Sequence, residues 1–273
     1  MIARGQNFKQ VPLEITGSST FGRYPKVSAS KTLNMFISDN FLVPYAGYKT
    51  VIDASLFDNN TEGRALHTST KLNKLVSVVG NGVYLIDITF NVSTLTATSI
   101  VVTRIGTLQT NTGIVYIAEN NKPQIAFSDG TKIYIYDPSL LPAFQIATIN
   151  FVPGFIDFHD TYFLCAASQD LGYAPPATNS WRLSESNNGL SWPSDAGHQG
   201  LIQTKPDKIQ AVVRFPSRGN MILVMGSTVT ESWYDLGLQL FPYQRNSSMS
   251  IDYGCLNPAT IASMDEIVVW LGV

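Results

Sequence analysis

Two apolar runs of the chain, Leu75-Val76-Ser77-Val78-Val79 and Val83-Tyr84-Leu85-Ile86-Asp87, are separated by Gly80-Asn81-Gly82. An Asn-Gly pair between β-branched and aromatic runs is among the strongest signals for a β-hairpin, because both central residues of the tight turn need a positive φ. This stretch therefore predicts an antiparallel hairpin over residues 75–87. It also supplies a pattern to look for in the rest of the chain.

The same pattern of strand, short turn and strand returns at regular intervals. It occurs around Ser128-Asp129-Gly130 and around Gly226-Ser227, each time between strand-like runs. Gly82 and Gly130 are 48 residues apart, and Gly130 and Gly226 are 96 residues apart, which is twice that interval. The skipped turn falls near residue 178, where Ala177-Thr178-Asn179 lies between two further strand-like runs. The chain is thus built from a repeat of about 48 residues.

A repeat of about 40–50 residues with four strands in each unit is the period of a β-propeller blade. A weaker strand-like run also precedes each hairpin by a short gap. These runs are Ala65 to Ser69, Ile114 to Ala118, Phe155 to His159, Ile209 to Phe215 and Thr260 to Met264. A β-sandwich, the alternative, would have many short strands without the regular interval. We therefore predict an all-β chain that forms a β-propeller of four-stranded blades.

The N-terminal segment, residues 1–50, differs from the remainder in being basic and in lacking sustained periodicity. We predict that it forms a basic N-terminal arm or wrapping segment and that residues 51–273 form the propeller blades. The arm either follows the surface of its own chain or contacts a partner. The basic residues that would make a partner contact are Arg4, Lys9, Arg23, Lys26 and Lys31.

The last strand-like run, residues 267–273, leaves its blade without a complete set of strands. Proteins avoid an unpaired apolar strand edge. Either the N-terminal segment supplies a missing strand, or the chain is a fragment of a longer protein. The apolar ending favours the second explanation, so we expect a propeller that is incomplete at the C-terminus.

Charge is scarce, and uncharged polar residues take its place. Of 273 residues only 14% are charged, the net charge is −2, and 25 serines and 23 threonines outnumber the charged residues. Aromatic residues make up 11%, which excludes a disordered chain. A near-neutral chain is not built to coat nucleic acid, and no run approaches the ~18 apolar residues of a membrane helix. We therefore expect no membrane partner.

The sequence contains few residues arranged for chemistry. It has no GxxxxGK[ST], HExxH or GxSxG motif, and its two cysteines, Cys165 and Cys255, are far apart and predicted to be free and buried. A single long-range disulfide between them is the alternative. The one adjacent His–acid pair, His159-Asp160, lies at an expected turn and is interpreted as a turn-capping pair. We predict no catalytic residues, no cofactor and no metal site, and hence no enzyme.

One segment resembles a motif of enzymes. Glu185-Ser186-Asn187-Asn188-Gly189-Leu190-Ser191-Trp192 is similar to the Asp-box of sialidase-type propellers, SxDxGxTW. Gly189, Ser191 and Trp192 match, whereas Glu185 and Asn187 replace the usual Ser and Asp. In that family the box is a turn-and-packing motif rather than a catalytic one. It predicts a tight turn held by the Trp ring.

Three acidic residues, Asp87, Asp137 and Asp235, follow apolar or aromatic residues at corresponding points of the repeat. We interpret them first as strand-end residues with a structural role. The functional alternative is a ring of carboxylates at one rim of the propeller, which would bind cations or repel DNA.

Several loose motifs, spread over most of the chain, resemble the packaged-DNA stabilisation or tail-hub proteins of short-tailed bacteriophages. They are Leu33-Asn34-Met35-Phe36, Pro44-Tyr45-Ala46-Gly47-Tyr48, the Gly80-Asn81-Gly82 hairpin, Ser180-Trp181-Arg182-Leu183-Ser184-Glu185, Pro206-Asp207-Lys208-Ile209, Met225-Gly226-Ser227-Thr228-Val229-Thr230-Glu231-Ser232-Trp233, and Asn257-Pro258 with Val269-Trp270-Leu271-Gly272. Members of that family are longer than this chain.

The resemblance implies a non-enzymatic part of the virion tail, assembled in the host cytoplasm as a homo-oligomeric ring below the portal. Its partners would be other tail and portal-proximal virion proteins, and packaged double-stranded DNA would pass without sequence-specific binding. Low charge suits such passage, because each phosphate contact by Lys or Arg adds a retaining force. The alternative function is a carbohydrate-binding or sialidase-like propeller. A generic protein-interaction propeller is a third possibility.

Overall fold

The chain divides into two units, residues 1–50 and residues 51–273. The computed structural model describes residues 35–38, 41–44, 52–57, 62–94, 96–216, 218–264 and 266–272. In the first unit, β1 (Met35–Ser38) pairs antiparallel with β2 (Phe41–Pro44). The basic residues predicted to contact a partner lie outside the described residues. They are Arg4, Lys9, Arg23, Lys26 and Lys31.

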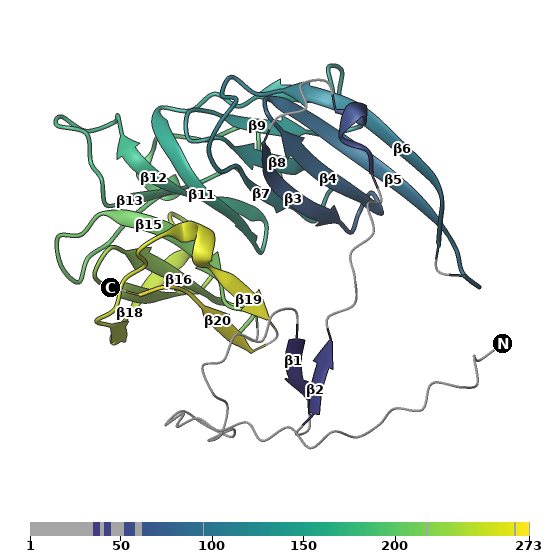
Figure 1. Ribbon diagram of the computed structural model, residues 1–273. Helices are drawn as coiled ribbons and strands as arrows, with labels where there is room; N and C mark the ends of the chain where they lie inside the picture. Colours follow the sequence, from purple (N-terminus) through teal and green to yellow (C-terminus); the bar gives the residue numbers. More distant parts are fainter. Residues whose placement is uncertain are drawn as a thin grey trace. The chain divides into compact units, whose positions relative to one another are not determined.

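The second unit contains four four-stranded antiparallel sheets, each made of consecutive strands (Figure 1). The first blade is β3 (Gly63–Ser69), β4 (Lys74–Val79), β5 (Gly82–Asn91) and β6 (Thr96–Thr107). The second is β7 (Tyr116–Glu119), β8 (Ile125–Ser128), β9 (Ile133–Tyr136) and β10 (Phe144–Ile146). The third is β11 (Phe151–His159), β12 (Tyr162–Asp170), β13 (Ser180–Leu183) and β14 (Gln199–Leu201). The fourth is β15 (Ile209–Arg214), β16 (Met221–Gly226), β17 (Thr230–Asp235) and β18 (Tyr243–Ile251).

A two-stranded hairpin of β19 (Ala262–Met264) and β20 (Ile267–Val269) follows the fourth blade. Three short 3₁₀ helices lie in connections, at η1 (Ala54–Leu56), η2 (Ala196–His198) and η3 (Pro258–Thr260). The fold is a β-propeller of four-stranded blades, as the 48-residue repeat predicts. Each predicted hairpin forms the middle pair of strands of its blade.

The turn of the first hairpin differs by one residue from the prediction. Val79 pairs with Gly82, so the two central residues are Gly80 and Asn81 rather than Asn81 and Gly82. Gly80 has a φ of 54°. A glycine at the first central position supplies the positive φ that one family of two-residue hairpin turns needs. The hairpin signal was therefore correct, but the glycine that makes the turn is Gly80.

Most of the middle strands are apolar along nearly their whole length because both of their faces are buried, whereas β17 has buried polar residues at Thr230, Glu231 and Ser232. Successive side chains of a strand point to opposite faces. On β12, Cys165 packs toward the second blade, whereas its neighbours Leu164 and Ala166 pack toward the fourth. A sheet covered on both faces gives near-continuous hydrophobic runs instead of alternation. The runs that identified the hairpins are therefore also the cores between blades.

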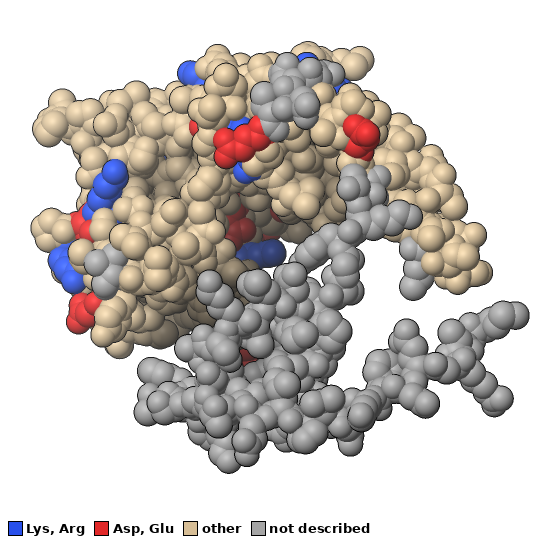
Figure 2. Space-filling model, viewed as in Figure 1, with Lys and Arg blue, Asp and Glu red and all other residues tan. Residues whose placement is uncertain are grey.

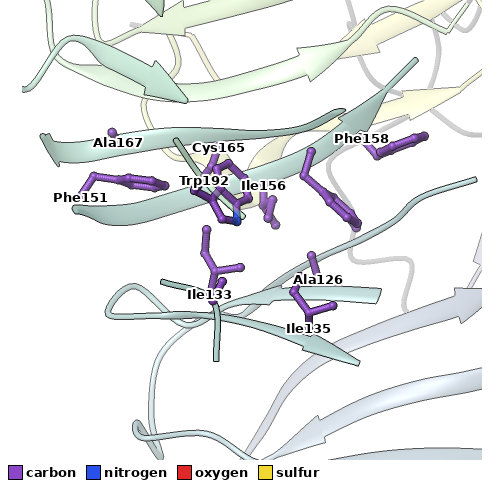
Figure 3. Close-up of a cluster of buried hydrophobic side chains, with 12 residues drawn as sticks. Ala126, Ile133, Ile135, Phe151, Ile156, Phe158, Cys165, Ala167 and Trp192 are labelled. Carbon is purple, nitrogen blue, oxygen red and sulfur yellow. The ribbon is translucent and has the colours of Figure 1, made fainter. Parts of the chain in front are cut away.

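The layer between the second and third blades illustrates this packing (Figure 3). Ile133 and Ile135 of β9 face Ile156 of β11, and the ring of Trp192 fills the space beside them. Each of these aliphatic side chains is almost fully buried. Burial of a side chain of this size contributes about 1.5–3 kcal/mol. Similar layers join the first blade to the second, the third to the fourth, and the fourth to the β19–β20 hairpin.

Candidate functional site

A cavity of about 890 Å³ lies where the first strands of the four blades converge. The strands β3, β7, β11 and β15 each form one edge of their sheet, and the residues at their ends line the cavity together with the turns that follow. Figure 2 shows a red and a blue patch where this unit is hollowed, with other charged atoms scattered over a surface that is mostly uncharged. We call this space the axial cavity.

Contacts between blades hold the wall of the axial cavity in place. Glu119, at the end of β7, accepts hydrogen bonds from the backbone amides of Thr70 and Lys71 in the first blade. Asn121 donates to the backbone carbonyl of Asp160, which joins the second blade to the third. Asp160 makes the turn between β11 and β12 with a φ of 55°. Each blade is therefore tied to the next by its first strand or first turn.

The third and fourth blades are joined through Asp157 and His159. Oδ2 of Asp157 accepts from the backbone amide of Arg214 at 2.9 Å. Nε2 of His159 donates to the backbone carbonyl of Gly219 at 2.9 Å, which leaves Nδ1 to accept from the hydroxyl of Tyr243. The carbonyl fixes this tautomer because it can only accept. His159 thus bridges two blades, and its ring does not cap the turn that we predicted it to cap.

Two lining carboxylates have pKa values shifted in opposite directions. Burial raises the pKa of Asp157 above its ordinary value, although amide donors and nearby Arg214 oppose the shift. Burial also acts to raise the pKa of Glu119, but its hydrogen bonds from Ser69, Thr70 and Lys71 outweigh that effect and leave the pKa lowered. In both residues the side-chain oxygens are already engaged by donors of the protein.

The cationic and imidazole groups of the cavity are less engaged. The guanidinium of Arg214 and the ammonium of Lys71 have no hydrogen-bond or ion-pair partner among the described residues. Nε2 of His67 is buried and has no hydrogen-bond partner there. Burial lowers the pKa of His67; the nearby positive charge of Arg214 lowers it further, and Glu119 opposes both. Arg214 of the fourth blade and His67 of the first therefore face a common space.

The three predicted rim carboxylates lie in different surroundings. Asp87 is partly exposed and pairs with Lys74 at 2.9 Å. It lies within β5 rather than at its end, because β5 continues to Asn91 in a two-stranded extension with β6. Among the described residues, no three His, Cys, Asp or Glu side chains form a group that could hold a metal ion.

Asp137 is buried and closes the second blade's third strand. Its Oδ1 accepts from the amide and hydroxyl of Ser139, and its Oδ2 accepts from Gln124. Burial acts to raise its pKa, but these donors outweigh burial and leave the pKa lowered. Asp235 ends β17, accepts from the amide of Gly237, and has Oδ2 3.9 Å from Nδ1 of His159. Asp137 and Asp235 therefore each stabilise a strand end, which is the structural role that we assigned first.

Two charged residues of the phage-like motifs, Arg182 and Glu231, are buried and hydrogen-bonded, whereas Glu185 and Lys208 are exposed. Arg182 and Asp170 form a bidentate pair at 2.9 and 2.8 Å and are almost inaccessible to solvent. Glu231 is fully buried and accepts from the amides of Gln203 and Thr204 and from the Trp233 ring. The Asp170–Arg182 pair therefore joins β12 to β13 within the third blade, whereas Glu231 links the fourth blade to the connection that follows β14 of the third.

The Asp-box-like segment forms the expected turn. Nε1 of Trp192 donates to the carbonyl of Gly189 at 2.7 Å, and the amide of Glu185 donates to the carbonyl of Ser191. The Trp192 ring is buried and packs edge-on against Phe151. The segment connects β13 to β14 in the chain, and its Trp192 ring packs in the layer between the second and third blades.

A second hollow of about 520 Å³ lies between the outer strands of the third and fourth blades. Trp233, Phe241 and Tyr243 border it, but Trp233 and Tyr243 are nearly fully buried against Trp181 and Phe241. Their ring faces are therefore not presented as an open stacking platform. In the described part of the chain, no helix is long and apolar enough to cross a membrane.

A projecting hairpin leaves the first blade. β4 pairs with β5 only as far as Ile86, so residues 87–101 pair only within the β5–β6 ribbon, which extends beyond the other strands (Figure 1). No Asp, Glu, Lys or Arg occurs between residues 88 and 103. Phe90, Val92 and Val101 are 54%, 87% and 54% exposed. This ribbon is thus uncharged and exposed, with apolar side chains among threonines and serines.

The residues of the axial cavity were not singled out from the sequence. A signal was present, because each of the weaker strand-like runs that precede the hairpins has a charged or imidazole side chain near its end. These side chains are His67, Glu119, Asp157 and Arg214. They recur once per blade, and the first strands of a propeller converge at its axis.

No protein-family model matches the chain, and no curated protein sequence matches it. Among solved structures, the chain is similar to PorZ, a surface component of the type-IX secretion system of Porphyromonas gingivalis. The identity is 9% and the TM-score is 0.44, and the match covers 80% of this chain and 25% of PorZ. It is also similar to AztD from Citrobacter koseri, with 9% identity and a TM-score of 0.47; the match covers 70% of this chain and 46% of AztD. It is similar as well to the N-terminal domain of Nup159, with 12% identity and a TM-score of 0.45; the match covers 70% of this chain and 45% of that domain. The chain thus spans a quarter to about half of these three proteins.

Proposed function

We propose that the chain is a structural component of a bacteriophage tail hub, which assembles as a homo-oligomeric ring below the portal, retains packaged DNA and forms part of the ejection conduit. It would act without catalysis or cofactor, in the virion tail, after assembly in the host cytoplasm. Its partners would be other tail and portal-proximal proteins. DNA would pass it without sequence-specific binding.

The observation that carries this proposal is the projecting hairpin. A free edge strand is normally protected by Lys, Pro or a bulge against pairing with other chains. The hairpin has no charged residue and no proline between positions 88 and 103, although its ladder has a register irregularity between Thr89 and Phe90. An exposed, uncharged ribbon with apolar side chains is typical of a surface that is covered in an assembly. We assign its occupant as a second copy of this chain, in keeping with a ring.

The motif resemblance to phage tail-hub proteins supplies the biological setting of the proposal. The low charge of the chain supports it in a second way, because a conduit that bound phosphates strongly would oppose the movement of DNA. The buried pairs of the motifs, such as Asp170 with Arg182, give a rigid body suited to a load-carrying ring.

Virions of the phage or prophage that encodes the chain provide the direct test. Mass spectrometry of purified particles should detect the chain in stoichiometric amounts, and electron microscopy should place it between portal and tail. Particles that lack the chain would exclude the proposal. A glycan array with a hydrolysis assay tests the alternative, and a specific sugar hit would favour a carbohydrate-binding propeller.

The role of the projecting hairpin has a separate test by mass photometry. Val92→Lys and Val101→Lys place like charges on the surfaces that would meet, so we expect ring formation to be lost. Leu141→Lys is the matched control, because Leu141 is 98% exposed and lies on another blade. Equal loss of assembly in all three variants would contradict a specific role of the hairpin.

A further inference from the structure

The axial cavity has the size of a binding site for a small group. Ligand pockets in proteins usually measure about 300–1,000 Å³ and contain a few convergent polar groups. The axial cavity, at about 890 Å³, is within that range and is lined by residues of all four blades. The tail-hub role proposed above does not use it, so the following inference is independent of that role.

Among the described residues, the groups of the cavity wall that keep free bonding capacity include the cations of Lys71 and Arg214 and the exposed carboxylate of Asp160. Glu119 and Asp157 bring negative charge, but their oxygens already accept from protein donors. The Arg214 guanidinium has no partner among the described residues, although it presents five N–H groups in a planar fork. A guanidinium of this kind binds a carboxylate in a bidentate manner.

We propose that the axial cavity binds a single carboxylate group through the guanidinium of Arg214 and Nζ of Lys71, beside the half-buried imidazole of His67. Arg214 is positioned by its own backbone amide, which donates to Asp157. Lys71 belongs to the turn between β3 and β4 of the first blade, and Arg214 to β15 of the fourth. A carboxylate bound to both would therefore link the first blade to the fourth.

The charge of the lining restricts the ligand to one negative group. Glu119, Asp157 and Asp160 border the same space as Lys71 and Arg214. A phosphate dianion or a polyanion would meet these carboxylates at short range, where like charges repel strongly in a partly buried site. A carboxylate has one charge and the planar shape that matches Arg214. It can belong to a small organic acid or to an Asp or Glu side chain of a protein partner.

Histidine NMR of the intact chain gives a direct measurement. The chain contains only three histidines, so the ring resonances can be assigned with His67→Asn. Two probes distinguish the source of the carboxylate: acetate, and the capped peptide acetyl-Ala-Glu-Ala-amide. We expect both to shift the His67 resonances saturably, and sodium chloride at equal ionic strength to leave them in place. Tighter binding of the peptide would identify a protein side chain as the source, and tighter binding of acetate a small acid.

Arg214→Gln is the decisive variant, because it removes the charge and retains the backbone amide that donates to Asp157. We expect at least a tenfold loss of affinity for either probe, in line with a charge-assisted bond. Arg218→Gln is the matched control: Arg218 is exposed in the following loop and does not line the cavity, so affinity should change less than twofold. Absence of any saturable shift in the unaltered protein, or equal affinity in Arg214→Gln, would overturn the proposal.

Discussion

The hydroxyl of Tyr243 donates to Nδ1 of His159 at 2.9 Å, which connects β18 of the fourth blade to the first strand of the third across 84 residues of sequence. Both side chains are more than nine-tenths buried. Burial is the main reason that the pKa of Tyr243 is raised, and the nearby negative charge of Asp235 adds to it. The phenol is therefore protonated, and able to donate, at neutral pH.

A double-mutant cycle measures this contact. Tyr243→Phe removes the donor and leaves Nδ1 of His159 unpaired, so the free energy of unfolding should fall by about 1–3 kcal/mol. His159→Phe should have a similar effect, and the double variant should lose less than the sum of the two. Urea unfolding of the four proteins gives the coupling energy. A coupling energy of zero would contradict a direct bond between the two side chains.

The buried Asp170–Arg182 pair should be far more sensitive than an exposed pair. Arg182→Met leaves the Asp170 carboxylate buried without its cation, and the expected loss is about 3–5 kcal/mol of unfolding free energy. The exposed pair of Lys74 and Asp87 is the comparison: Lys74→Met should cost less than about 1 kcal/mol. Equal effects in urea unfolding would contradict the burial of the first pair.

Acid should destabilise the protein through carboxyls whose pKa is lowered in the folded state. Burial acts to raise the pKa of Asp170, but the donors Arg182 and Ser180 outweigh burial and leave it below the ordinary value of 3.8. The same balance, with Lys132 and Thr131 as donors, applies to Asp129. The unfolded chain then binds more protons, so this stability is present above pH 3.8 and is lost as the pH falls through the folded pKa values.

Urea unfolding between pH 6 and pH 2 tests the direction of this pH dependence. The free energy of unfolding should decline below about pH 4, and the decline should be shallower in Asp170→Asn. The contribution of Asp157 to stability depends on pH in the opposite direction, because burial raises its pKa. This contribution is present at low pH and is lost as the pH rises through the folded pKa. Asp157→Asn should therefore leave the acid decline in place. A steeper decline in Asp170→Asn would contradict this explanation.

Gly200 is required by the indole ring of Trp181. A Cβ added at Gly200 would overlap that ring, which packs against Trp233, Phe241 and Tyr243. Overpacking of this kind costs about 1–3 kcal/mol, so Gly200→Ala should lower the midpoint of thermal unfolding. Gly63→Ala is the control, because nothing lies within 4 Å of its added Cβ. An unchanged midpoint in Gly200→Ala would show that the cluster can rearrange.

The sequence was informative wherever a strand is covered on both faces. The runs around Gly80-Asn81 and Gly226-Ser227 revealed the middle strands, because burial on both faces demands continuous apolar residues. The outer strands were not predicted. β10 and β14 have only three residues each, and β6 is mostly exposed and rich in threonine, so none has a buried face that leaves a pattern.

The axial cavity could not be read from local patterns. Its residues are single polar side chains at the ends of short strands, and they come together only because the blades converge. The acidic residues that the repeat did emphasise, Asp87 and Asp137, are distinguished by strand position, and the structure gives each a different partner. The regular spacing of the sequence therefore predicted the blades but not the axial cavity on which they converge.

Two of the packing interfaces of the propeller each contain one cysteine, which serves as a natural probe of that interface. Cys165 lies in the layer between the second and third blades, whereas Cys255 lies in the layer between the fourth blade and the β19–β20 hairpin. Both thiols are free and buried, and burial raises the pKa of each, that of Cys165 to about 12. A thiol reagent can modify either residue only after its own interface has opened. Two labelling rates measured in one unmodified chain would therefore show whether the propeller separates at one interface before the other.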